Sequence, residues 1–255
     1  MTRTQDLPPR LTRLTFHGPL SESRATGLVE RLALGKPSGV LDIGCGWGEL
    51  MLRVLDAVPG ATGRGIDLNA EDLARGRANA AARGLGDRAE FLEQSATDAA
   101  LDPADLVLCL SASHALSGAE PPHHTTEALK ALRRLVTPGG RVLLAEGYWQ
   151  RPPTQTELSA MWPDARADEY DDLAGLVDRA VAAGFRPAWV ETANRDEWEA
   201  FESGYQSDKE IWLAAHPDHP LAEETRDKLD RHRGTWLRGY RDVLGIAYLT
   251  LVPVA

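Results

Sequence analysis

The stretch VLDIGCGWGEL at positions 40–50 carries three glycines at alternate positions between two apolar runs. Glycine is unfavourable inside strands and helices, because it loses the most backbone freedom on folding. The spacing therefore predicts a turn between a strand and a helix, in which the backbone closely approaches another group. In a parallel α/β sheet, such a turn brings a ligand to a helix N-terminus at the carboxyl end of the strand.

The rest of the chain supports a parallel sheet. Apolar runs of strand length alternate with segments of helical periodicity, which predicts a mostly parallel sheet covered on both faces. We expect residues 1–255 to form one α/β domain. Strands are expected at 39–43, 62–67, 89–94, 104–110, 141–146, 186–191 and 244–252, and helices at 21–34, 49–58, 70–83, 124–135 and 169–183.

One long region breaks the alternation. Residues 195–241 show helical periodicity without a strand, and the segment HPDHP at 216–220 divides them because proline ends helices. Trp198 and Tyr205 are spaced to share one face of the first helix. We therefore predict a helical lid over residues 194–241, inserted between the last two strands.

Composition narrows the class of partner. The formal net charge is −10, and an acidic surface without a basic stripe repels nucleic acids. No apolar run approaches the roughly 20 residues of a membrane span, and the N-terminus lacks the apolar core of a signal peptide. We expect a cytoplasmic protein with neither a nucleic-acid nor a membrane partner. The sequence indicates no oligomeric state.

A carboxylate follows the glycines at a telling distance. Asp67 ends the next predicted strand, about twenty residues on, where it can accept hydrogen bonds from both hydroxyls of a ribose. The pair of signals predicts a cofactor that contains a nucleoside. The glycine pattern is G-x-G-x-G followed by Glu49, whereas a dinucleotide fingerprint is G-x-G-x-x-G, and an acidic helix start disfavours a pyrophosphate. An NAD-dependent oxidoreductase is thus the less favoured alternative.

Together, these segments resemble the class I S-adenosylmethionine-dependent methyltransferases. LDIGCGWGEL is similar to the first motif of that family and GIDLN to the second. EFLEQSATD resembles the third motif and ADLVLCLSASHAL the fourth, and LRRLVTPGGRVLLAEGYW resembles the strand motif that follows the next helix. The resemblance covers roughly residues 40–148, the expected cofactor-binding core, with a cap segment and first helix at 15–38. It implies a Rossmann-like seven-stranded sheet in the order 3-2-1-4-5-7-6 with the last strand antiparallel.

The same resemblance implies S-adenosyl-L-methionine as the cofactor and assigns residues to it. The glycines would hold the methionine part, and Asp42 would order their loop and reach the ammonium group through water. Asp67 would bind the ribose, Leu68 would pack on the adenine, and Ala96 with Asp98 would meet the adenine edge. The residues implied for the cofactor are Asp42, Gly44, Gly46, Gly48, Asp67, Leu68, Ala96, Asp98 and Ser111.

The catalytic candidates follow the fourth and fifth strands, because active-site groups come from the carboxyl ends of strands in an open parallel sheet. His114 is the best candidate for a base, since imidazole titrates near neutral pH; a role in positioning its loop is the alternative. Glu146 could bind an amine or take a proton, or be a satisfied strand-end carboxylate, and Tyr148 lies beside it. The substrate-binding candidates are Phe16, His17, Trp149, Trp198 and Tyr205.

Other functions remain open at this stage. A protein of this family's fold can bind the cofactor and catalyse a reaction other than methyl transfer, or only bind it. The cluster of His114, His123 and His124 matches no common metal spacing, so we expect no metal site. The acidic surface, the aromatic-rich insert and the lack of a further recognition domain favour a small-molecule acceptor. The acceptor atom cannot be read from the sequence.

Overall fold

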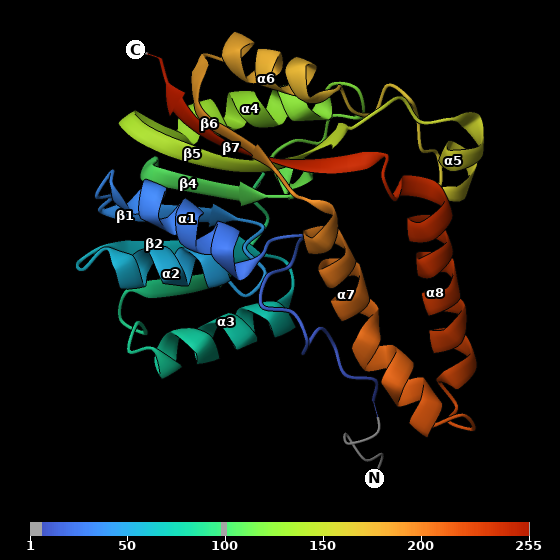
Figure 1. The fold of residues 1–255 in the computed structure, drawn as a ribbon. Helices are drawn as coiled ribbons and strands as arrows, with labels where there is room; N and C mark the ends of the chain where they lie inside the picture. The colour runs from blue at the N-terminus through green and yellow to red at the C-terminus, as the bar shows by residue number, and fades with distance from the viewer. Residues whose placement is uncertain (1–6, 98–100, 255) are drawn as a thin grey trace.

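The computed structural model describes residues 7–97 and 101–254. Its core is one seven-stranded sheet in the order β3-β2-β1-β4-β5-β7-β6 (Figure 1). The strands are β1 (Gly39–Ile43), β2 (Thr62–Asp67), β3 (Ala89–Glu93), β4 (Ala104–Leu110), β5 (Val136–Trp149), β6 (Phe185–Thr192) and β7 (Leu244–Pro253). Only β7 runs antiparallel to its neighbours. The predicted strand order and the antiparallel last strand are confirmed.

Helices cover both faces of the sheet (Figure 1). On one face, α1 (Glu22–Ala33), α2 (Glu49–Ala57) and α3 (Ala70–Ala82) bury apolar side chains against alternate strand residues such as Val40 and Leu106. On the other face, α4 (His124–Leu135) and α6 (Leu173–Ala182) pack on residues such as Leu41 and Val107. Because successive side chains of each strand point to opposite faces, the sheet contributes to two separate hydrophobic cores.

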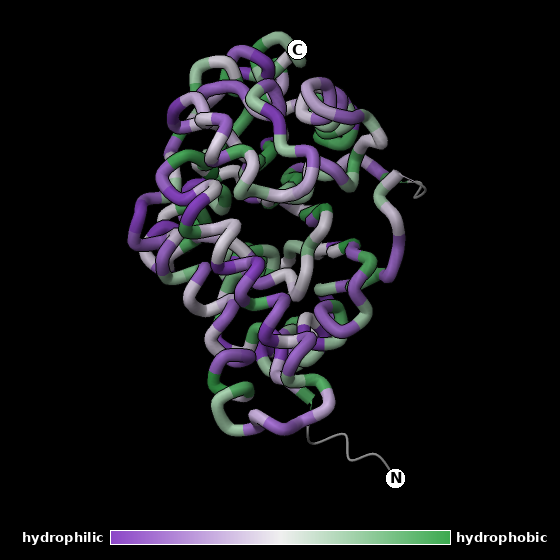
Figure 2. Tube along the Cα trace, turned by 90° about the vertical axis from the view of Figure 1, so that its right-hand side faces the viewer, coloured by the Kyte–Doolittle hydropathy of each residue, from purple (hydrophilic) through white to green (hydrophobic). Residues whose placement is uncertain are grey.

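The region between β6 and β7 forms the predicted helical insert. It contains α7 (Arg195–Ala215), α8 (Ala222–Gly234) and the π-helix η2 (Thr235–Tyr240), and it extends from the end of the sheet where the parallel strands finish (Figure 1). Asn194 begins α7 with a capping box, in which its side chain accepts from the Glu197 N–H. Figure 2 shows hydrophilic and hydrophobic residues alternating along these helices, as expected for helices with one buried face.

The N-terminal segment, residues 7–20, runs between α3 and α7 (Figure 1). The Asp208 carboxylate of α7 accepts from the Thr12 N–H at 2.6 Å and from its hydroxyl at 2.8 Å. From the other side, the Arg75 guanidinium of α3 donates to the Leu14 carbonyl at 2.7 Å, and Arg10 pairs with Asp72. The segment therefore bridges the sheet domain and the insert.

The structure also contains elements that the sequence pattern did not predict. They are the short helix α5 (Gln155–Ala160), which begins at a capping box on Thr154, and the 3₁₀ turn η1 (Ser113–Leu116). In addition, β5 is longer than expected at both ends, and α6 begins late because Asp172 caps it. Within the described parts of the chain, no helix is long and apolar enough to cross a membrane.

Candidate active site

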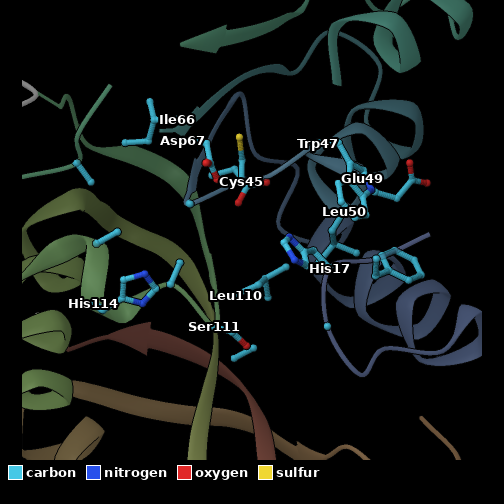
Figure 3. Close-up of a pocket in the computed structure, with 18 of the residues that line it drawn as sticks. His17, Cys45, Trp47, Glu49, Leu50, Ile66, Asp67, Leu110, Ser111 and His114 are labelled. Atoms are coloured by element: carbon cyan, nitrogen blue, oxygen red, sulfur yellow. The ribbon is translucent and has the colours of Figure 1, made fainter. Parts of the chain in front are cut away.

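A cavity of about 440 Å³ lies at the carboxyl ends of β1, β2 and β4 (Figure 3). We call it the main cavity. The glycine loop, residues 44–48, and the N-terminal segment border it, with Phe201 of α7 and Tyr248 of β7. Its volume lies within the range typical of small-ligand sites. His17 and His114 stand on opposite sides of it (Figure 3).

The glycine loop has the left-handed backbone that glycine adopts at no steric cost. Gly44 has a φ of 60°, and a Cβ there would lie 2.4 Å from the Ala112 Cβ. Gly48 has a φ of 65°, and a Cβ there would lie 2.6 Å from the Phe91 ring. The groups that approach this backbone are therefore the loop after β4 and the β3 side chain. The cradle between them forms part of the main-cavity wall at Gly44.

Asp67, at the end of β2, organises the same loop. One carboxylate oxygen accepts from the Gly46 N–H at 2.8 Å, and the other accepts from the Asn69 N–H at 2.8 Å. Each oxygen keeps further lone pairs, and the side chain lines the main cavity. Asp67 can therefore accept hydrogen bonds from a ligand while it holds the glycine loop in place.

Asp42, at the end of β1, lines the main cavity but is only 2% exposed. Burial, together with the nearby charge of Asp67, raises its pKa to about 8. Removing a carboxylate from water disfavours its charged form, and a second carboxylate adds to the effect. A cation bound in the cavity would relieve both penalties.

The wall at the end of β4 is formed by Leu110, Ser111 and His114 (Figure 3). Ser111 has a φ of 55°, which is rare for a residue with a side chain, and its N–H donates to the Ala145 carbonyl at 2.8 Å. This sharp turn leads directly into η1, which carries His114. On the β2 and β3 side, the wall includes Leu68, which is 71% exposed.

Of the remaining cofactor predictions, Ala96 lines the main cavity, whereas Asp98 lies outside the described residues. Gly46 and Gly48 shape the loop without lining the cavity; Gly46 does so through its bond to Asp67.

Phe16 and His17 of the N-terminal segment line one side of the main cavity. The His17 ring stacks on Trp47 at 5.2 Å between centroids, and the Arg75 guanidinium lies 3.9 Å from the Trp47 ring centroid. The Trp47 indole N–H donates to the Thr15 carbonyl at 2.7 Å. Trp47 thus joins the glycine loop to the N-terminal segment.

Glu49, whose charge argued against a pyrophosphate, is held by two arginines. Its carboxylate pairs with Arg53 at 2.7 Å and with Arg83 at 2.6 Å, and the residue is 7% exposed. The side chain therefore ties α2 to α3. Its charge is largely neutralised within the protein, which weakens it as a discriminator between ligands.

A second cavity of about 370 Å³ adjoins the main one on the α4 side. The two share Ser111 and His114. Glu146 lines the second cavity, and its Oε1 accepts from the Gly147 N–H at 3.0 Å. Burial raises the pKa of Glu146, while the Ser113 hydroxyl and the Gly147 N–H oppose the shift. His114 and Glu146 thus belong to one connected region.

The structure does not bring four of the predicted catalytic or substrate-binding residues to either cavity. Tyr148 packs over Gly245, its partner on β7, so its ring fills the space of a missing side chain. Trp149 is 4% exposed and stacks edge-on against Tyr170. Trp198 and Tyr205 lie beside Tyr240 and His232 of the insert respectively, and both also pack on buried residues outside the insert. These rings face neighbouring helices and strands, so they contribute to packing and do not line either cavity.

The sequence analysis missed several cavity residues, among them Tyr248 and Phe201. Tyr248 is paired with Ala145 across β5 and β7, and its hydroxyl donates to the Pro19 carbonyl at 3.0 Å. Phe201 lies three residues after Trp198 on α7. Only the antiparallel pairing of β7 could have indicated Tyr248.

Known proteins resemble this chain over most of its length. A family model described as a methyltransferase domain matches residues 40–140. YjhP of Escherichia coli strain K12 is 26% identical over 238 residues, which are 93% of this chain and 93% of YjhP. A release factor glutamine methyltransferase of Bradyrhizobium diazoefficiens is 32% identical over 169 residues, covering 58% of this chain and 56% of that protein.

A solved structure agrees with the observed fold. A SAM-dependent methyltransferase from Geobacter sulfurreducens, in complex with S-adenosyl-L-homocysteine, is 26% identical and gives a TM-score of 0.82. The alignment covers 96% of this chain and 98% of the Geobacter chain. The segment matched by the family model runs from β1 into β5 and so contains the glycine loop, Asp67 and the end of β4.

Proposed function

We propose that this chain, which belongs to the class I S-adenosylmethionine-dependent methyltransferase superfamily, transfers a methyl group to a small-molecule acceptor. The observation that supports this most is the joint geometry of Asp67 and the glycine loop. The carboxylate already accepts two backbone N–H groups and retains lone pairs toward the cavity. When bound, S-adenosylmethionine supplies a sulfonium methyl group that a nucleophile can displace in line.

The residues around the main cavity fit this cofactor. Asp67 would accept from its ribose hydroxyls, and Leu68 and Ala96 would border its adenine. Asp42 would face its ammonium group, because a buried carboxylate is stabilised by a nearby cation. Gly44 lies in the wall of the main cavity, where the methionine part would contact the loop backbone. The protein's own contribution is then to align the nucleophile and exclude water.

A small acceptor is supported by how the main cavity is closed. The N-terminal segment covers it with Phe16 and His17, and α7 adds Phe201. Asp208 and Arg75 hold the N-terminal segment from opposite sides. A macromolecular acceptor would need an open groove here, whereas the cover formed by the N-terminal segment and α7 favours a small molecule.

His114 is proposed to orient or deprotonate the acceptor. It lies on the turn after β4 and borders both cavities. A general base must reach the proton that it removes, and the junction between two cavities is a suitable position. Replacing His114 with alanine should then lower turnover by about 100-fold while cofactor affinity changes little.

The Asp67 assignment can be tested by titrating S-adenosylhomocysteine into purified protein in a calorimeter. Asp67→Ala should weaken binding by about 2 kcal/mol, or about thirtyfold, if two charge-assisted hydrogen bonds are lost. Asp178→Ala, at an exposed position on α6, is the matched control. Unchanged affinity in Asp67→Ala would remove this carboxylate from the cofactor site.

Methyl transfer itself is tested with methyl-labelled S-adenosylmethionine and a panel of small acceptors. Transfer of label to an acceptor supports the proposal. Tight cofactor binding without transfer to any acceptor would favour the alternative in which the same fold binds the cofactor for another reaction.

A further inference from the structure

The second cavity is positioned to hold the acceptor. It shares Ser111 and His114 with the main cavity, so a molecule in it would reach the end of β4 from the side opposite the N-terminal segment. This step rests on the proposed function, in which the main cavity holds the cofactor. What the second cavity selects is then set by its own wall.

Two buried polar atoms in that wall have no partner among the described residues: Glu146 Oε2 and His124 Nδ1. Glu146 is only 4% exposed. Buried polar groups are nearly always hydrogen-bonded, and each exception calls for a ligand, a water or another explanation. Both residues belong to the wall of the same cavity. A carboxylate oxygen accepts hydrogen bonds, and Nδ1 does so when the imidazole proton lies on Nε2.

The charge of the wall is one-sided. Among the described residues that line the second cavity are three carboxylates, Glu120, Glu146 and Glu169, and no lysine or arginine. The Tyr170 ring lines it as well. That ring is held edge-on by Trp149 at 5.1 Å between centroids. Aromatic faces and carboxylates both attract cations.

We propose that the second cavity binds the acceptor through a protonated amine, with the Glu146 carboxylate as its counter-ion. His124 accepts a further N–H of the same ammonium group, and Tyr170 forms the aromatic side of the site. The acceptor is therefore a small cationic amine. Which of its atoms takes the methyl group is decided at the junction by Ser111 and His114.

The surroundings explain why no cation among the described residues pairs with the Glu146 carboxylate. The Arg179 guanidinium, whose charge helps to lower the pKa of His124, is already held by Asp171 and donates to the Thr126 hydroxyl at 2.8 Å. Burial raises the pKa of Glu146 because no protein cation offsets its charge. A bound ammonium would supply the missing charge and favour the ionised carboxylate.

The test uses three probes with the same apolar body and different head groups: 2-phenylethylammonium, 2-phenylethanol and 3-phenylpropanoate. Each is titrated into the full chain saturated with S-adenosylhomocysteine. We expect the ammonium to bind at least tenfold more tightly than the alcohol, and the carboxylate to bind most weakly. Glu146→Gln should remove the tenfold preference. Glu127→Gln, which lies on α4 and loses only an exposed pair with Lys130, should retain it.

The outcomes separate this inference from the proposed function. If S-adenosylhomocysteine itself does not bind, the proposed function fails. If it binds but the ammonium shows no saturable binding up to millimolar concentration, or no preference over the alcohol, only the present inference is overturned. A preference that persists in Glu146→Gln overturns the role of that carboxylate. The head-group series on the wild-type protein decides the substrate class even if Glu146→Gln does not fold.

Discussion

Cofactor binding should release a proton from Asp42. The carboxyl group is 2% exposed and has a pKa of about 8 in the free protein, raised by burial and by the charge of Asp67. At pH 7, about nine-tenths of the free molecules therefore carry a proton on Asp42. If the ammonium group of the cofactor lies beside this carboxylate, its pKa should fall to near its ordinary value of 3.8, and binding should release about 0.9 proton.

The assay is calorimetric titration of S-adenosylhomocysteine at pH 7 in phosphate and in Tris, whose ionisation enthalpies differ. The difference in binding enthalpy gives the number of protons released. Affinity should also rise by nearly tenfold from pH 6 to pH 7 and level off near pH 8. In Asp42→Asn, the part of both effects that comes from Asp42 should vanish. Protons exchanged by other groups persist in the variant, so the difference between the two proteins isolates Asp42.

The same pKa makes a prediction about stability. The folded-state pKa lies above the unfolded value of 3.8, so the folded state binds this proton more tightly. The free protein should therefore lose stability as pH rises from about 4 to 8, by at most about 5 kcal/mol from this group. Asp42→Asn should lack that loss. Two results would refute the assignment of the released proton to Asp42. One is equal proton release on cofactor binding by the wild type and Asp42→Asn, and the other is a wild-type cofactor affinity that does not change with pH.

Two further predictions concern the walls of the main cavity. Gly44→Ala places a Cβ against the loop after β4 at a left-handed φ, and it should lower the free energy of unfolding in urea by about 2–4 kcal/mol. Gly46→Ala, whose Cβ would meet nothing closer than 3.7 Å, should lower it by only about 1–2 kcal/mol. Equal losses in the two variants would contradict the role of close packing. Asp208→Ala removes the hydrogen bonds that hold the N-terminal segment to α7. Amide hydrogen exchange over residues 11–18 should therefore become faster, and cofactor binding should weaken several-fold. Unchanged exchange would show that other contacts hold the segment.

Much of the fold and part of the main-cavity wall could be predicted, because local rules determine them. The glycine spacing reports backbone conformation directly, and the structure places Gly44 and Gly48 at positive φ. Asp67 could be found from its distance to the glycines, since consecutive parallel strands end at one edge of the sheet. The insert could be predicted because its two prolines interrupt a long helical pattern.

The acceptor side could not be predicted to the same degree, because it depends on which way strand side chains face. In β5, the alternation sends Ala145 to the main cavity, and Glu146 to the second. Tyr148 lies on the same face of β5 as Glu146, but its ring packs over Gly245 and does not reach the second cavity. Trp198 and Tyr205 share a helix face as predicted, yet their rings pack on α8, η2 and neighbouring buried residues and do not line either cavity. Their fate depends on tertiary contacts that no local pattern encodes.

The distribution of charge in the main cavity has a catalytic consequence under the proposed function. Asp42 and Asp67 stand at the ends of β1 and β2, whereas the described residues on the β4 and β5 side of the wall, which include Leu110, Ser111, His114 and Ala145, contain no carboxylate. Methyl transfer removes the positive charge from the sulfonium as the transition state forms. A carboxylate beside the sulfur would stabilise the ground state more than the transition state and slow the reaction. Carboxylates that grip the ribose and the ammonium, with none among the described residues where the charge disappears, contribute binding free energy without that penalty.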